Sequence, residues 1–101
     1  MEHRYHQRKS AHGEVELWRG DDLLGRFETR DVSLEGAFVK AEAKELETYD
    51  VVTVVVHDRR GGPLHRTLAM VVHQSQEGTG LLYEAEAPDL YRCLTRDLEA
   101  A

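Results

Sequence analysis

The sequence predicts an all-β fold, a small barrel or sandwich, that ends in a single helix. Five or six short segments with strand character follow one another along the 101 residues, and this spacing is typical of antiparallel sheets rather than of alternating strands and helices. The last segment differs, because leucines recur every four residues at Leu90, Leu94 and Leu98. With Pro88 and Asp89 at its start, it is predicted to be an amphipathic helix of about three turns.

Each expected strand has its own pattern. Glu14–Arg19 alternates polar and apolar residues, as a half-buried strand does. Leu23–Val32 continues after the turn residues 20–22, and Val51–His57 is rich in β-branched residues, which favours a buried place in the sheet. The remaining expectations are a strand beginning at Ala37, strands at 64–73 and 81–85, a loop at 59–63 and a turn at 75–80.

Composition limits the function classes. A chain of 101 residues makes one domain with a modest core, and its single cysteine, Cys93, excludes an intramolecular disulfide. No segment reaches the roughly 20 apolar residues of a membrane-spanning helix, and no secretory leader is visible. We therefore expect a cytoplasmic protein without membrane insertion. The formal net charge of −6 argues against binding a nucleic-acid polymer, which requires a basic face.

The first 13 residues differ from the rest of the chain. They show neither a helix nor a strand period, and they carry Arg4, Arg8 and Lys9 against a single acidic residue, Glu2. A segment with so few apolar residues cannot bury enough surface to fold alone. The expected organisation is a mobile arm at 1–13, a sheet at 14–86 and a helix at 88–100. Such a cationic arm suits a small anion better than a polymer.

Two short motifs carry a functional signal. Arg4 and Arg8 form R-x-x-x-R, and a guanidinium can hold a phosphate, stack on a base or bond the guanine edge. Asp31, Ser33 and Gly36 form D-x-S-x-x-G at the end of the second strand. A carboxylate, a small hydroxyl and a glycine free to take positive φ suit a turn that presents polar groups to a compact ligand. The same residues are also favoured in ordinary turns.

In the order and spacing of these motifs the chain resembles the PilZ domain family, bacterial receptor modules for cyclic di-GMP. The resemblance covers nearly the whole chain, since both motifs are complete and a G-x-x-Y follows late, at Gly80 and Tyr83. It implies a small six-stranded antiparallel β-barrel with a C-terminal α-helix. In that family fold the N-terminal arm folds over a dinucleotide on the barrel surface.

The resemblance also implies a role for each motif residue. Arg4 and Arg8 would grip the phosphates and stack on, or hydrogen-bond, the guanine bases. Asp31 would accept from the guanine N1–H and N2–H₂ edge or fix an arginine in place, Ser33 would bond a base or phosphate oxygen, and Gly36 would let the backbone approach closely. Auxiliary contacts are expected from His3, Lys9 and Arg30.

The sequence also bears on alternative functions. No serine-hydrolase elbow, P-loop or zinc-protease motif occurs, so neither an enzyme nor a cofactor is expected, and the histidines of the arm lack the cysteine or carboxylate partners of a metal site. The main alternative is a PilZ-like protein–protein interaction module with weak or no nucleotide binding. An unidentified effector protein is an expected partner. The helix is expected to cap one barrel opening, the alternative being a partner-docking or dimerisation helix.

Overall fold

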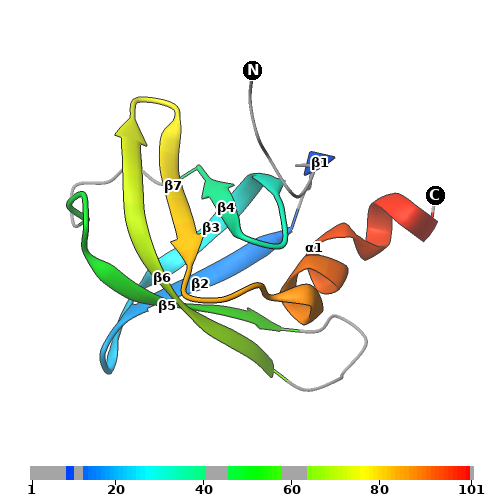
Figure 1. The fold of residues 1–101 in the computed structure, drawn as a ribbon, viewed down its shortest axis with the longest axis horizontal. Coiled ribbons are helices and arrows are strands. Elements are labelled where there is room, and N and C mark those ends of the chain that lie inside the picture. Colours follow the sequence, from blue (N-terminus) through cyan, green and yellow to red (C-terminus); the bar gives the residue numbers. More distant parts are fainter. Residues whose placement is uncertain (1–8, 11–12, 41–45, 58–63, 101) are drawn as a thin grey trace.

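Six antiparallel strands close into a barrel, with one helix at its end (Figure 1). The structure is a computed structural model that describes residues 9–10, 13–40, 46–57 and 64–100, without the side chains of 9–10 and 96–100. The elements are β1 (Lys9–Ser10), β2 (Glu14–Arg19), β3 (Asp22–Val32), β4 (Gly36–Val39), β5 (Val51–His57), β6 (Leu64–Ser75), β7 (Gly78–Tyr83) and α1 (Pro88–Ala100). The predicted six-stranded antiparallel barrel with a C-terminal helix is confirmed.

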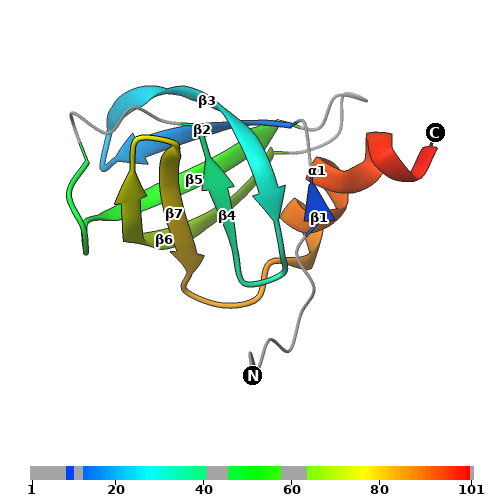
Figure 2. The same cartoon turned by 90° about the horizontal axis from the view of Figure 1, so that it is seen from above.

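The barrel closes through β3. The strand order is β1-β3-β2-β5-β6-β7-β4, and β3 pairs with β4 as well as with β2. The first part of β3 lies along β2, from Asp22 to Glu28, and its last residues lie along β4. Figure 2 shows β3 curving over the barrel between these two neighbours. The D-x-S-x-x-G motif follows directly, at the turn from β3 into β4.

The core is built from side chains that point into the barrel, and β4 is buried along its whole length. In β2, for example, Val15 and Leu17 point inward and are buried. The helix joins this core, because Leu90 and Leu94 are buried in the same cluster. Leu94 packs so closely on Gly13 that a Cβ atom there would meet its side chain. The apolar stripe of α1 therefore packs on the barrel as expected, at one end of it (Figures 1 and 2).

The second half of the chain departs from the predicted bounds. β6 continues to Ser75, and β7 runs from Gly78 to Tyr83 rather than from 81 to 85. Gly78 looks like a turn residue in the sequence, yet it lies in the sheet, where a Cβ atom would overlap the carbonyl oxygen of Val39. Glycines mark such a close backbone approach as readily as they mark a turn. The expected loop at 59–63 lies outside the described residues.

The arm also differs from its expectation. Lys9 and Ser10 form β1, although no strand was expected before Glu14. The reason is the greater length of β3, which continues beyond the residue opposite Glu14, where β2 begins. Its last residues therefore offer their backbone groups to the segment that precedes β2. Two residues carry no periodicity, so this strand is defined only by its partner.

Candidate functional site

Ser33 holds together the turn between β3 and β4. Its hydroxyl oxygen accepts hydrogen bonds from the backbone N–H groups of Glu35 (3.1 Å) and Gly36 (3.2 Å). The N–H of Ser33 donates to the carbonyl of Gly36 at 2.9 Å. Because Ser33 is buried, its hydroxyl serves the turn and is not presented at the surface.

The turn is also fixed from outside. The carbonyl oxygen of Glu35 accepts from the N–H of Tyr83 at 2.7 Å, and that of Leu34 accepts from the N–H of Ala87 at 2.9 Å. The end of β7 and the segment leading to α1 therefore clamp the motif onto the barrel. This turn is a rigid part of the fold, with its backbone acceptors already satisfied.

Gly36 is required by the neighbouring strand. It pairs with Leu82 across β4 and β7, and a Cβ atom on it would overlap the carbonyl oxygen of Leu81. Its φ is not among the positive values, so the freedom of glycine to take positive φ is not used here. The close approach that Gly36 permits in this structure is that of β7.

Arg30 and Asp31 lie side by side because β3 carries a bulge. Thr29 pairs with Val39 and Asp31 with Phe38, which leaves Arg30 as the extra residue. A bulge re-aims its side chain, and here the guanidinium carbon of Arg30 lies 3.8 Å from the centre of the Phe38 ring. The Nε of Arg30 also donates to Oδ2 of Asp31 at 3.1 Å.

The bulge thus assembles an outer surface beside the motif. Arg30 also contacts Glu77 in the turn between β6 and β7, with its Nη1 3.0 Å from Oε2 of Glu77. The side chain of Arg30 stays half-exposed. Phe38 is next to His73 in space, their ring centres 6.4 Å apart. A guanidinium and a carboxylate are groups that can recognise a charged, planar ligand. Here they belong to Asp31 of the motif and to Arg30 beside it rather than to Ser33, and the buried ring of Phe38 supports the guanidinium from below.

The start of the described chain runs along the same strand. In β1, Lys9 pairs with Val32 and Ser10 with Asp31. Further on, the N–H of Thr29 donates to the carbonyl of Gly13 at 2.8 Å, and the buried hydroxyl of Thr29 bonds the same glycine. The backbone that follows the R-x-x-x-R motif therefore lies against the D-x-S-x-x-G strand. His3, Arg4 and Arg8 lie outside the described residues, as does the side chain of Lys9.

These features agree with a comparison against protein families. The model of the PilZ domain matches residues 2–99, which is nearly the whole chain and includes both motifs. The chain belongs to the PilZ domain family. No curated protein matches it in sequence.

Three solved structures share its fold, and one of them is a PilZ domain by its description. The Bacillus subtilis inhibitor of motility (MotI/DgrA) superposes with a TM-score of 0.69 at 17% identity, over 100% of this chain and 54% of that protein. This chain thus spans about half the length of that relative. The PilZ domain of CeSA from a cellulose-synthesizing bacterium gives 0.65 at 18% identity, over 93% of this chain and 96% of that one. An uncharacterized Legionella protein gives 0.58 at 18%, with the same coverages.

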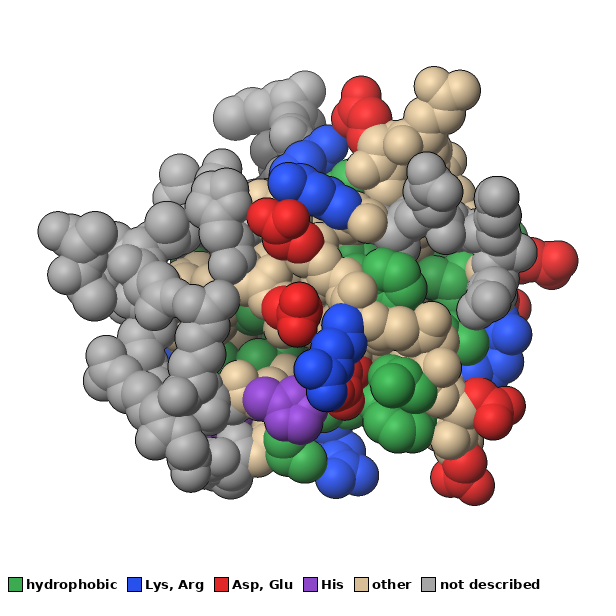
Figure 3. Space-filling view, turned by 180° about the vertical axis from the view of Figure 1, so that it is seen from behind, with side chains coloured by type: hydrophobic (Ala, Val, Ile, Leu, Met, Phe, Trp, Pro, Cys, Tyr) green, Lys and Arg blue, Asp and Glu red, His purple; other side chains and the backbone are tan. Residues whose placement is uncertain are grey.

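A second polar cluster, which the sequence did not reveal, lies on the outer face of this PilZ barrel. Oε1 of Glu16 accepts from Nε1 of Trp18 at 3.1 Å, and Oε2 lies 3.1 Å from Nε of Arg26 and 3.0 Å from Nε2 of His57. These partners cover the carboxylate, whose side chain is only 8% exposed. Figure 3, seen from behind, shows basic, acidic and histidine side chains gathered on one face.

The pKa of Glu16 reflects this environment. Burial by itself raises the pKa of the carboxyl group, but the hydrogen bonds from Trp18 and His57 and the charges of His57 and Arg26 outweigh it. The net pKa is lower than usual, so the carboxylate stays charged and stabilises the pairing of β2 with its neighbours. His57 lies at the end of β5, where its side chain is exposed but has Glu16 as a partner.

The described residues form neither a membrane-spanning helix nor a cluster of metal ligands. No helix in that part of the chain is long and apolar enough to cross a membrane. Nor does it bring together three histidine, cysteine or acidic side chains that could hold a metal ion.

Proposed function

We propose that this PilZ domain is a cytoplasmic receptor for cyclic di-GMP in which the N-terminal arginines close over the dinucleotide at the D-x-S-x-x-G turn. One observation carries the proposal: β1, which follows R-x-x-x-R directly, pairs with the strand that ends in Asp31 and Val32. The family match, which spans both motifs, supports it. Arg8 directly precedes β1 in the sequence, and on this ground we infer that the two motifs act on one ligand.

Each motif would contribute differently. Arg4 and Arg8 carry the charge that two phosphates need and the planar surface that stacks on guanine. Asp31 would accept from the N1–H and N2–H₂ groups of guanine, with Arg30 holding its carboxylate in place through the 3.1 Å hydrogen bond. Ser33 and Gly36 would keep this geometry by fixing the turn. A direct bond from the Ser33 hydroxyl to a ligand oxygen would replace the long bond of 3.5 Å that it donates to the carbonyl of Gly36.

The order of the arm would provide the signal. A segment rich in charge and poor in apolar residues pays conformational entropy when it is ordered. A dianionic ligand offsets that cost by neutralising the arginines, and the ordered arm then presents a new surface to an effector protein. Lys9 and His3 would add charge at the rim of the same site.

A second function is favoured by a specific observation. Ser33 and Gly36 are both explained by the fold itself, and one structural neighbour is described as an inhibitor of motility. A PilZ module that works through protein contacts, with weak or no nucleotide binding, would need the same turn. Its motif would then be retained for stability.

Isothermal titration distinguishes the two functions. The wild-type chain should bind cyclic di-GMP and should bind GTP and cyclic di-AMP far more weakly. Arg8→Ala should lose about 1.5–3 kcal/mol of binding free energy, roughly 10- to 150-fold in affinity. Arg92→Ala is the matched control, since Arg92 also belongs to an R-x-x-x-R spacing but forms an ion pair with Asp89 on α1. Equal affinities for all three nucleotides, or none, would favour the interaction module.

A further inference from the structure

The outer side of β5, β6 and β7 carries a cluster of exposed apolar side chains. Val51 pairs with Met70, and Met70 pairs with Leu82, so these three form one row across the strands. Leu68 precedes Met70 on the same side of β6, and Leu82 is 48% exposed. Val51, Leu68, Met70 and Leu82 line a shallow pocket of about 310 Å³. With Tyr49 and Val72, both exposed, these six residues make up what we call the apolar face.

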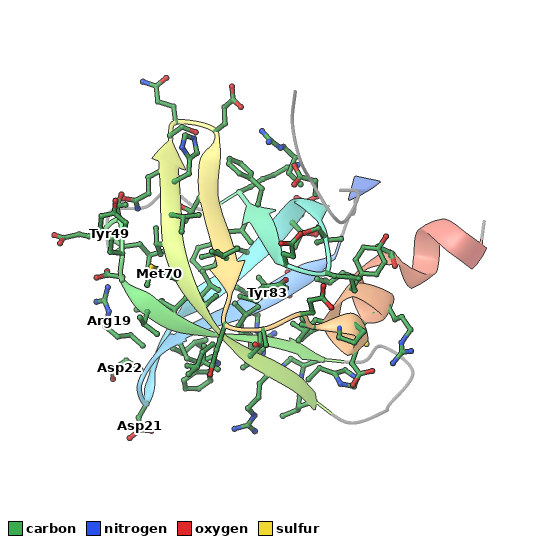
Figure 4. All side chains as sticks on the ribbon, viewed as in Figure 1. Arg19, Asp21, Asp22, Tyr49, Met70 and Tyr83 are labelled. Carbon is green, nitrogen blue, oxygen red and sulfur yellow. The ribbon has the colours of Figure 1, made fainter. Side chains whose placement is uncertain are left out.

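Tyr49 stands at the edge of this face in an unfavourable backbone conformation. Its φ is 77°, the only positive value recorded for a described residue other than glycine, and a conformation that residues with a large side chain rarely adopt. Its side chain is 74% exposed. Figure 4 shows Tyr49 and Met70 on the same side of the molecule, away from the helix.

The surrounding turn enforces that conformation. The N–H of Tyr49 donates to the carbonyl of Val71 at 2.6 Å. The carboxylate of Asp50 accepts from the N–H of Glu47 at 2.9 Å and from Nη2 of Arg19 at 2.8 Å. Strain held in place by such a network is a feature of functional positions, and an exposed, rigidly presented tyrosine is typical of binding hot spots.

The charges around the apolar face decide what can cover it. Exposed carboxylates border it at Glu47 in the Tyr49 turn and at Glu84 beside Leu82. The Arg19–Asp50 ion pair brings the β2–β3 turn alongside, with Asp21 and Asp22 exposed at the same edge (Figure 4). Arg19 is paired with Asp50, so its charge does not offset the other carboxylates of the border. Arg66, which precedes Leu68 on β6, is the exposed cation that offsets them in part. Counted over the residues that the structure describes, the border is therefore acidic.

An acidic border disfavours two of the candidate occupants. Two copies of this face would bring like charges together, which costs free energy at an interface. An anionic membrane surface would be repelled in the same way. A segment that combines apolar side chains with lysine or arginine would satisfy both the apolar face and its border.

We propose that the apolar face is a docking surface for a basic, apolar segment of another protein, with Tyr49 as the anchoring side chain. The face begins next to the D-x-S-x-x-G turn, because Leu82 pairs directly with Gly36. In a receptor of the kind proposed above, a partner docked here would lie beside the ligand-closed arm. Docking itself does not depend on that function, since the face is built from β5–β7 and the Tyr49 turn.

Selection from a random peptide library tests the proposal on the full chain. Peptides panned against the immobilised protein should be enriched in leucine, isoleucine or phenylalanine together with lysine or arginine. A selected peptide, labelled with a fluorophore, should bind at least about tenfold more weakly to Leu82→Ser or Met70→Ser, and rising salt should weaken it further. Leu64→Ser is the matched control, because Leu64 is also 48% exposed and lies on β6 outside the face; its affinity should be unchanged.

Tyr49→Gly separates docking from stability. Glycine accepts φ near 77° without strain, so this variant should unfold at the same or higher urea concentration while it binds the peptide more weakly. The proposal is overturned by peptides that lack basic residues, or by peptides that bind Leu82→Ser as well as wild type. Self-association of the wild-type chain, or its co-sedimentation with phosphatidylserine vesicles, would also overturn the proposal if Leu82→Ser abolishes it. The selection is performed without cyclic di-GMP, so its failure would leave the receptor proposal standing, and a failed nucleotide titration would leave this one standing.

Discussion

Replacing Ser33 with alanine should destabilise the protein by about 2–3 kcal/mol. The magnitude follows from the hydrogen bonds that the hydroxyl accepts, from Glu35 at 3.1 Å and from Gly36 at 3.2 Å. A polar group that is left unsatisfied in a buried place costs about 1–3 kcal/mol, and the Gly36 bond is buried whereas that of Glu35 is partly exposed. The backbone bond between Ser33 and Gly36 remains, so the turn should persist and the chain should still fold.

Urea unfolding followed by the fluorescence of Trp18, the only tryptophan, measures this loss. Ser75→Ala is the matched control, because the hydroxyl of Ser75 also accepts from a backbone N–H, that of Glu77 at 3.2 Å, but in an exposed turn. We expect that control to change stability by no more than about 0.5 kcal/mol. A loss for Ser33→Ala as small as that of Ser75→Ala would refute the conclusion that Ser33 holds the turn.

Three further outcomes are expected. Gly36→Ala should lower the free energy of unfolding by more than about 3 kcal/mol, because its Cβ would overlap the backbone of Leu81 and backbone atoms move aside less readily than a side chain. Urea unfolding measures this loss, and a loss of less than about 1 kcal/mol would count against the close approach of β7 to Gly36. The stability that Glu16 contributes should be fully present above its ordinary pKa of 4.5 and should disappear as pH falls through its lowered folded pKa. Unfolding at several pH values should therefore show a steeper acid loss for wild type than for Glu16→Gln, and parallel curves would contradict this. Asp31→Ala should weaken cyclic di-GMP much more than cyclic di-AMP in titration calorimetry, since adenine lacks the donors that Asp31 would accept from; equal losses would assign Asp31 to the turn alone.

The strands and the helix could be predicted because their signals are local. The alternation in Glu14–Arg19 and the leucines of α1 describe which face is buried, whatever lies opposite. The two failures depend on partners far away in the sequence. Lys9–Ser10 is a strand only because β3 is long enough to pair with it. Gly78 pairs with Ser75 at the start of β7, and it is a glycine because the carbonyl of Val39 approaches it closely.

The candidate site was predicted less completely than the fold. The sequence locates the motif at a strand end, but it does not tell that the hydroxyl of Ser33 is engaged inside the turn. It also could not place Arg30 over Phe38, since a bulge shifts the register that simple alternation would give. The cluster at Glu16 had a weak signal: Arg26 is directly opposite in the β2–β3 pairing, and a cross-strand ion pair follows from that register.

Amide NMR during titration with cyclic di-GMP tests the central claim most directly. If the arginines close over a ligand held at the motif, the amide signals of Ser10 and of Asp31–Gly36 should shift together and saturate at one equivalence point, and amides of residues 1–8 should gain protection from exchange. The strand Val51–His57, which supplies Val52, Val54 and Val56 to the core, should scarcely change, because the barrel core needs no ligand. Shifts confined to another face of the barrel, or an arm whose exchange is unaltered by saturating ligand, would contradict the account.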